Sequence, residues 1–276
     1  GLFGVSVAQI SAMIDTWFAS YLHGGSISWL YYSDRLTYFP LGVMGVAIAT
    51  VILPHLSKQH AMANSAKYHA SLDWGIRQIL FWGLPSALGL FWLAGPIVTT
   101  LFQHGHFTEH DALMTSYSLM AYVLGLPAFM LIKVLASGFY SRENVRTPVN
   151  MAAVALAINV ILNSLLVGPL AHAGLALATA IAASVNACML MVMLRKMDYF
   201  QPLPGWPSYL LKLLVACAVV TVWLYCFRGD WQHWIMWSRW TQLMRLAFLI
   251  GGAMVLYGST LWVLGMRKRD FYVAGT

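Results

Sequence analysis

Long apolar stretches separated by short polar segments run the length of this chain. They lie at residues 3–22, 29–56, 78–101, 112–136, 149–167, 173–194, 208–227 and 243–265. About 20 such residues cross the ~30 Å hydrocarbon core of a bilayer as one helix. The pattern therefore predicts eight transmembrane helices in an all-α polytopic membrane protein. The second stretch is longer than a crossing needs, so we expect it to extend beyond the bilayer or to bend at Pro40.

The composition supports this class. Hydrophobic residues make up 60% of the chain and charged residues 9%, against about 25% charged in soluble domains. An ordinary soluble enzyme is therefore excluded. The basic residues are scattered between apolar stretches, so no nucleic-acid partner is expected. Three cysteines within or at the ends of apolar stretches lack any CxxC spacing, which argues against a disulfide framework or a zinc site.

Basic residues gather on one face if all eight stretches cross. That face collects eleven of them, Lys58, Lys67, Arg77, Arg142, Arg146, Arg195, Lys196, Lys212, Arg267, Lys268 and Arg269. The opposite face holds only Arg228 and Arg239. By the positive-inside rule the first face is cytoplasmic. The C-terminal tail is therefore expected in the cytoplasm.

Two polar segments divide the chain. Residues 57–76 are polar with scattered apolar positions, which favours an amphipathic helix on the cytoplasmic surface, a solvated connector being the alternative. Residues 201–207, QPLPGWP, form a Pro- and Gly-rich break. We therefore expect a six-helix lobe at 1–200, including the linker, and a terminal helix pair with a cytoplasmic tail at 201–276. Six helices are the usual size of one half of a duplicated transporter.

Motifs for bond chemistry are missing from the sequence. It contains no Walker A, nucleophile elbow, HExxH or Gly-rich dinucleotide turn, so we expect no enzyme. The chain enters its first apolar stretch at Gly1 without an initiator Met or a charged segment, so we expect no signal peptide and a piece of a longer protein.

The outer loop 103–111, QHGHFTEHD, is dense in possible metal ligands: His104, His106, Glu109, His110 and Asp111. It matches no standard zinc spacing. A solvated loop with an N-cap for the next helix is the better interpretation.

Arg35 is a charge within an apolar stretch, where insertion costs about 2.5–3.5 kcal/mol, so a functional role is the first hypothesis. A guanidinium in a water-filled cavity would offer two parallel donors to a phosphate or pyrophosphate. The alternative is an interfacial arginine that snorkels outward and neutralises Asp34, with Trp29, Tyr31 and Tyr32 as an aromatic belt. For Lys133, which lies in the inner part of its stretch, a side chain that snorkels to the cytoplasmic interface is favoured over a functional charge.

Asp15 lies in the middle of the first stretch, with Ser11 one turn before it. Asn159 and Asn163 share one helix face at i and i+4, and Thr179 lies in the next stretch. Such polar groups commonly hydrogen-bond between helices. Together they could also form an all-oxygen pocket around one negative charge, which would suit Na⁺.

The sequence resembles the MurJ (MviN) family of lipid II flippases, in the multidrug/oligosaccharidyl-lipid/polysaccharide exporter superfamily. The likeness is carried by GVSVAQISAMIDTWFAS, SISWLYYSDRLTYFPLGVMGVAIATVILPHLSK, GFYSRENVRTPV, GPLAHAGLALA and LRK. Family members have fourteen helices in two six-helix lobes and a final pair. The resemblance implies that this chain is the C-terminal half, without the N-terminal lobe, and that its terminal pair forms a groove for a lipid tail.

The resemblance also implies site residues. Arg35 matches a cavity arginine that engages pyrophosphate, and Ser28 and Asp34 match positions near it. The family's sodium site is matched by Asp15, Asn159, Asn163, Thr179 and the carbonyl of Leu175. Asn163 stands where the family has an acidic residue, so this site would carry less negative charge.

The implied function is transport of the undecaprenyl-pyrophosphate-linked peptidoglycan precursor, lipid II, to the outer leaflet of the bacterial inner membrane by alternating access. The expected partners are lipid II, membrane lipids and the N-terminal lobe. No cofactor is expected, with Na⁺ as the one candidate ion. The alternatives are a cation-coupled exporter of drugs or of other lipid-linked oligosaccharides in the same superfamily, and a structural membrane protein without transport.

Overall fold

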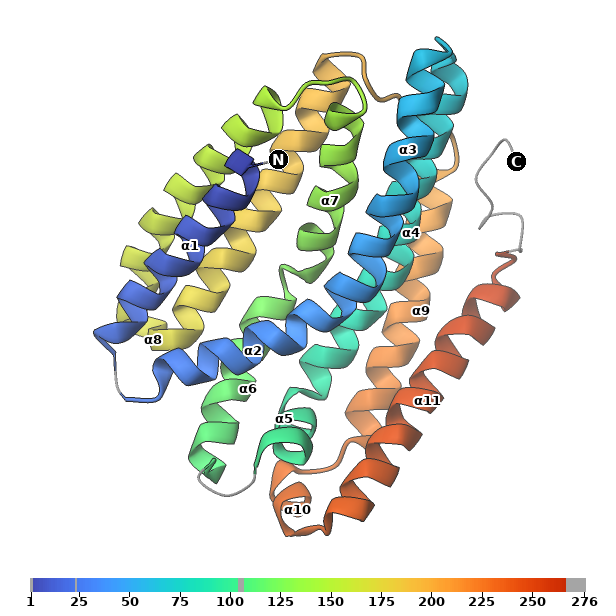
Figure 1. Ribbon diagram of the computed structural model, residues 1–276. Coiled ribbons are helices and arrows are strands. Elements are labelled where there is room, and N and C mark those ends of the chain that lie inside the picture. Colours follow the sequence, from blue (N-terminus) through green and yellow to red (C-terminus); the bar gives the residue numbers. More distant parts are fainter. Residues whose placement is uncertain (1, 23, 104–106, 267–276) are drawn as a thin grey trace.

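The computed structural model describes residues 2–22, 24–103 and 107–266, and every regular element in them is helical. In chain order these are α1 (Leu2–Ser20), α2 (Ser26–Pro40), the π-helical η1 (Leu41–Val46), α3 (Ala47–Ala61), α4 (Ser65–Trp92), α5 (Ala94–Phe102), α6 (Glu109–Val123), α7 (Leu126–Tyr140), α8 (Arg146–Lys196), α9 (Trp206–Phe227), α10 (Trp231–Met236) and α11 (Arg239–Val263) (Figure 1). The all-α class is confirmed.

Several helices in the described part of the chain are long and apolar enough to cross a membrane. Four qualify alone, and up to six if each of two bent pairs is one span. The bends are 72° between α4 and α5 and 41° between α6 and α7. In addition α8 is broken at Ala171, whose φ of 50° and ψ of −131° are not helical. Its two legs lie side by side in Figure 1. The total of eight spans stays a prediction.

The second apolar stretch bends, which was one of the two expectations for it. Pro40 ends α2, and the π-helical turn η1 follows it directly. Figure 1 shows α2 and α3 running in different directions on either side of this turn. Proline supplies no backbone N–H and crowds the preceding turn, which favours such a break.

The expectation of a separate amphipathic helix at 57–76 is wrong. Residues 57–61 complete α3, residues 62–64 form a turn, and residues 65–76 belong to α4. Tyr68, Leu72 and Ile76 recur at helical spacing and are buried in the protein core. These widely spaced apolar positions face other helices rather than lipid headgroups, because α4 packs along α3 and α7.

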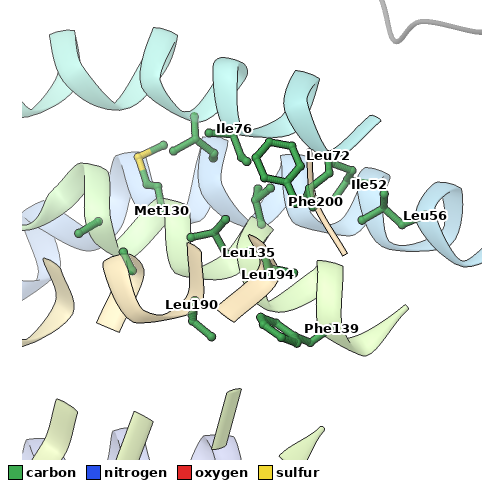
Figure 2. Packing of buried hydrophobic residues seen from close by; sticks show 14 of the residues in the cluster. Ile52, Leu56, Leu72, Ile76, Met130, Leu135, Phe139, Leu190, Leu194 and Phe200 are labelled. Atoms are coloured by element: carbon green, nitrogen blue, oxygen red, sulfur yellow. The ribbon is translucent and has the colours of Figure 1, made fainter. Parts of the chain in front are cut away.

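The main hydrophobic core joins α3, α4, α7 and the end of α8. Leu56, Leu72, Phe139 and Leu194 are completely buried there. Figure 2 shows these side chains meeting from the different helices, with Phe200 among them. A second cluster joins α9 to α11 and to α4. The predicted break before the terminal helices is confirmed, since α8 ends at Lys196 and α9 begins at Trp206.

The connections between helices gather at two ends of the bundle. The α3–α4, α7–α8 and α8–α9 connections lie at the upper end of Figure 1. The lower end holds α10, the ends of α1 and α5 and the starts of α2 and α6. Basic residues in or beside the upper connections include Lys58, Lys67, Arg142 and Arg195. This arrangement agrees with the alternation expected from the charges. Arg267, Lys268 and Arg269 lie outside the described residues.

Gly125, at the bend between α6 and α7, allows close contact with the second leg of α8. A Cβ at this position would lie 2.6 Å from Ala180 Cα and 2.8 Å from Ala180 Cβ. Side-chain rotation cannot relieve a clash with backbone, so α8 would have to shift.

We expect Gly125→Ala to lower the free energy of unfolding by about 1–3 kcal/mol, the usual cost of overpacking. The measurement is the thermal midpoint of the detergent-solubilised protein. Gly89→Ala is the matched control, because no atom lies within 4 Å of its added Cβ and alanine favours a helix. Equal midpoints for the two variants would contradict the packing argument.

Candidate functional site

The predicted oxygen ligands meet between α1 and the two legs of α8. Asn163 Nδ2 donates to Asp15 Oδ1 at 2.7 Å. The Thr179 hydroxyl lies 3.1 Å from Asp15 Oδ2 and 3.0 Å from the Leu175 carbonyl oxygen. Asn159 Nδ2 lies 3.0 Å from Ser11 Oγ and 3.4 Å from Thr179 Oγ1. We call Ser11, Asp15, Asn159, Asn163, Leu175 and Thr179 the oxygen cluster.

The break at Ala171 brings this cluster together. Asn159 and Asn163 share a face of the first leg, and Leu175 and Thr179 share a face of the second, because each pair has i, i+4 spacing. Gly174 lets the legs approach closely: a Cβ there would lie 2.3 Å from the Leu166 carbonyl oxygen. Sequence spacing predicted the first pair and the family resemblance implied the second, and the fold places the two pairs face to face.

The chemistry of the oxygen cluster fits a small hard cation. Asp15 is 9% exposed and Asn163 is fully buried. In the part of the chain that the structure describes, Asp15 forms no ion pair with a basic side chain. The Oδ1 atoms of Asn159 and Asn163 are buried without a hydrogen-bond partner. A buried carboxylate and orphaned amide oxygens are both costly, and an oxygen-coordinated cation would satisfy all three.

A site for a softer metal is not formed by these residues. No group of three or more His, Cys, Asp or Glu side chains that could hold a metal occurs within 2–22, 24–103 and 107–266. In the loop 103–111, Thr108 and Asp111 form a capping box for α6, which confirms the expected N-cap. His104 and His106 lie outside the described residues.

Arg35 lies on the exposed face of α2, together with Ser28 and Asp34. Its guanidinium carbon lies 4.9 Å from the centre of the Tyr31 ring. Among the described residues Arg35 forms no ion pair with Asp34 and no side-chain hydrogen bond. The structure thus brings the three predicted substrate residues onto one surface and leaves the arginine donors facing outward.

The alternative in which Trp29, Tyr31 and Tyr32 form an aromatic belt is wrong for two of its members. Trp29 is only 5% exposed. Tyr32 packs against Phe102 and Phe107 at ring distances of 4.7 and 5.4 Å. Helical periodicity turns these two rings toward the protein, while Tyr31 alone of the three is exposed.

Sequence reasoning missed a group of three side chains near the start of α2. Trp29 Nε1 donates to Asp111 Oδ1 at 2.9 Å. The Trp29 ring lies 4.9 Å from that of His172, and His172 Nε2 lies 2.8 Å from the Met114 carbonyl oxygen. We call Trp29, Asp111 and His172 the outer brace. The sequence indicates Asp111 only as a possible metal ligand in a polar loop, and nothing local links it to a tryptophan 82 positions earlier.

A second missed group attaches the segment before α9 to α4. Asp73 is 2% exposed and accepts hydrogen bonds from Arg77 Nε, Trp206 Nε1 and the Leu203 N–H at 2.6, 2.7 and 3.1 Å. Arg77 donates to the Pro204 carbonyl at 3.1 Å, and its guanidinium carbon lies 4.8 Å from the Trp206 ring centre. The signal in the sequence was an acidic and a basic residue at i, i+4.

Lys133 is exposed on α7 and lies in neither the oxygen cluster nor the outer brace. Its carbonyl oxygen accepts a hydrogen bond from the Ser137 hydroxyl at 2.9 Å. Its snorkelling stays a prediction.

Comparison with known proteins places the chain among flippases. The family model described as "Lipid II flippase MurJ" matches residues 1–244. A probable lipid II flippase MurJ of Vibrio cholerae is 43% identical over 99% of this chain and 52% of its own length. The Haemophilus influenzae relative is 41% identical over 97% of the chain and 53% of its own length. The lipid II flippase MurJ of Burkholderia cenocepacia is 39% identical over 98% and 52%.

A solved structure agrees with this. It is described as lipid II flippase MurJ in an inward closed conformation, and it matches with a TM-score of 0.74 and 26% identity. The match covers 93% of this chain and 51% of the solved chain. The chain thus spans about half the length of the relatives it matches.

Proposed function

The chain belongs to the MurJ family of lipid II flippases, and we propose that it forms the C-terminal lobe and terminal helix pair of such a flippase. The transported molecule is lipid II, the undecaprenyl-pyrophosphate-linked peptidoglycan precursor. The protein is a multi-pass membrane protein, and we place it in the bacterial inner membrane with its C-terminus in the cytoplasm. Its work is transport, with no bond made or broken.

The observation that carries this proposal is the outward-facing Arg35. An arginine presents several N–H donors in a planar fork that matches phosphate oxygens. The opposite face of α2, with Ser33 and Thr37, is buried against neighbouring helices, so Arg35 projects from the solvent-facing side of a packed helix. The exposed face, including Ser28 and Asp34, lines the central cavity, and the N-terminal lobe closes it from the other side.

Alternating access requires the lobe to move around this site. The π-helical turn η1 divides the segment that carries Arg35 from α3. Single π-helical turns are frequent at functional sites. Motion at this turn would reorient α2 while the core between α3, α4 and α7 stays packed.

The oxygen cluster would hold Na⁺. Asp15, Thr179 and the Leu175 carbonyl would supply oxygens directly, and rotation of the Asn159 and Asn163 amides would present theirs. A bound cation supplies the positive charge that compensates the buried carboxylate. Because its ligands come from α1 and both legs of α8, binding would draw these three segments together.

Replacement of Arg35 tests the substrate site. The design is a chimera in which this chain replaces the matching half of the Vibrio cholerae relative. We expect Arg35→Ala to abolish complementation of a flippase-depleted strain at normal abundance, because each charge-assisted hydrogen bond contributes about 1.5–3 kcal/mol. Arg35→Lys should be intermediate, since it keeps the charge and loses the fork.

Arg239→Ala is the control for this experiment, because Arg239 is exposed at the start of α11, outside the proposed site. Full activity of Arg35→Ala would refute the substrate-binding role. Loss of activity that follows loss of abundance would assign Arg35 to insertion instead.

Replacement of Asp15 tests the cation site. We expect NaCl, compared with choline chloride, to raise the thermal midpoint of the purified chimera, and Asp15→Asn to remove the increase. A ligand at 100 times its Kd stabilises the folded state by about 2.7 kcal/mol.

Asn163→Asp should lower the Na⁺ concentration needed to raise the thermal midpoint, because it adds a negative charge to the cluster. Asp34→Asn is the control, since this carboxylate lies outside the cluster. An unchanged sodium response in Asp15→Asn would assign Asp15 to packing.

A further inference from the structure

The outer brace has a rigid acceptor at its centre. Asp111 Oδ2 accepts hydrogen bonds from the Thr108 N–H at 2.8 Å and the Thr108 hydroxyl at 2.7 Å. Asp111 Oδ1 accepts the Trp29 indole N–H. Since the capping box holds the carboxylate on the first turn of α6, the indole hydrogen bond ties the start of α2 to that turn.

The start of α2 is shaped around the same indole. Gly25, with a φ of 105°, precedes the helix, and a Cβ there would lie 2.7 Å from the Trp29 ring. One turn later the Ser33 hydroxyl lies 2.6 Å from the Trp29 carbonyl oxygen and 2.9 Å from the Thr115 carbonyl oxygen. The first half of α2 is therefore attached to α6 at two successive turns. Arg35 follows Trp29 by six residues, which is about 9 Å along the helix axis at a rise of 1.5 Å per residue.

The other side of the brace leads to the oxygen cluster. His172 directly follows the broken position Ala171 and begins the second leg of α8. Leu175, whose carbonyl belongs to the oxygen cluster, is three residues further on. Leu175 is also completely buried in a hydrophobic group with Ala19 of α1 and Leu30 of α2. The second leg thus contacts Trp29 through the His172 ring and shares a buried cluster with α1 and α2.

We propose that the outer brace couples the oxygen cluster to the exposed face of α2, so that Trp29 and His172 are positioning residues for Arg35. When a cation draws Asp15, Thr179 and the Leu175 carbonyl together, the second leg of α8 shifts and His172 moves the start of α2. The inference rests on the proposed function, because it gives the cation cluster and Arg35 a common mechanism. It assigns to Trp29, Asp111 and His172 a role in transmission, without contact to substrate or ion.

The experiment reads the position of α2 directly. In a cysteine-free form of the chimera, Ser28→Cys places a reporter on the exposed face of α2. Its labelling rate by a membrane-impermeant maleimide is compared in NaCl and choline chloride. We expect the two rates to differ by about fivefold or more, the lower range of ordinary allosteric coupling. Asp15→Asn should abolish the difference.

Trp29→Phe keeps an aromatic ring and removes the donor to Asp111. His172→Phe likewise removes the hydrogen bond to the Met114 carbonyl. We expect each to reduce the sodium-dependent difference to below about twofold, which is too small for a coupling in the ordinary range. The rise of the thermal midpoint with Na⁺ should persist in both variants, because the oxygen cluster is intact. Trp223→Phe is the matched control, since it removes an indole donor to the Leu249 carbonyl at 3.1 Å within the terminal helices, and it should leave both responses unchanged.

The outcomes separate the two proposals. A full labelling response in Trp29→Phe and His172→Phe would overturn the coupling and leave the cation site standing. Loss of the midpoint response together with the labelling response would show a general structural role for the brace, which also overturns it. A parent chimera whose thermal midpoint responds to Na⁺ but whose labelling rate does not would also overturn the coupling. Absence of any midpoint response to Na⁺ in the parent would refute the cation site and the coupling with it.

Discussion

The reversal of α8 at Ala171 is the constraint on which the rest of the structure depends. A residue with a Cβ seldom adopts a positive φ, because the Cβ crowds the backbone. The surrounding contacts hold it there: Gly174 packs against the Leu166 carbonyl, and His172 is buried on Trp29. Without this reversal the amides of one leg and the hydroxyl of the other could not reach the same carboxylate. The kink therefore fixes the oxygen cluster and the outer brace together.

Burial makes the oxygen cluster sensitive to its exact arrangement. A carboxylate removed from water needs either a cation or several donors. Asp15 has two donors, Asn163 and Thr179, from different legs of α8. Separation of those legs would expose an unsatisfied charge to an apolar surrounding. The electrostatic cost of burial makes a carboxylate rare in a membrane. The same cost makes the Asp15 carboxylate hold together the segments that supply its donors.

Local sequence patterns predicted the all-α class and the shared face of Asn159 and Asn163, and they failed where distant segments decide. Length and hydropathy located each apolar stretch, and i, i+4 spacing placed Asn159 with Asn163. The amphipathic prediction for 57–76 failed because a helix buried among other helices and a helix on lipid headgroups show similar periodicity. The roles of Trp29 and Asp73 were missed because their partners lie 82 and 133 positions away. Those contacts depend on how helices pack, which no local pattern contains.

The attachment of Asp73 to the segment before α9 has an evolutionary consequence. Removing one partner of a buried charge pair costs about 3–5 kcal/mol, a large share of the stability of most proteins. Replacement of Asp73 alone would leave Arg77 without its carboxylate and the Trp206 and Leu203 donors without an acceptor. Substitutions at these positions are therefore tolerated only together. Asp73, Arg77 and Trp206 should therefore vary together among related sequences. The contact between α4 and the terminal helices should be retained even where the remaining surface of α9 and α11 diverges.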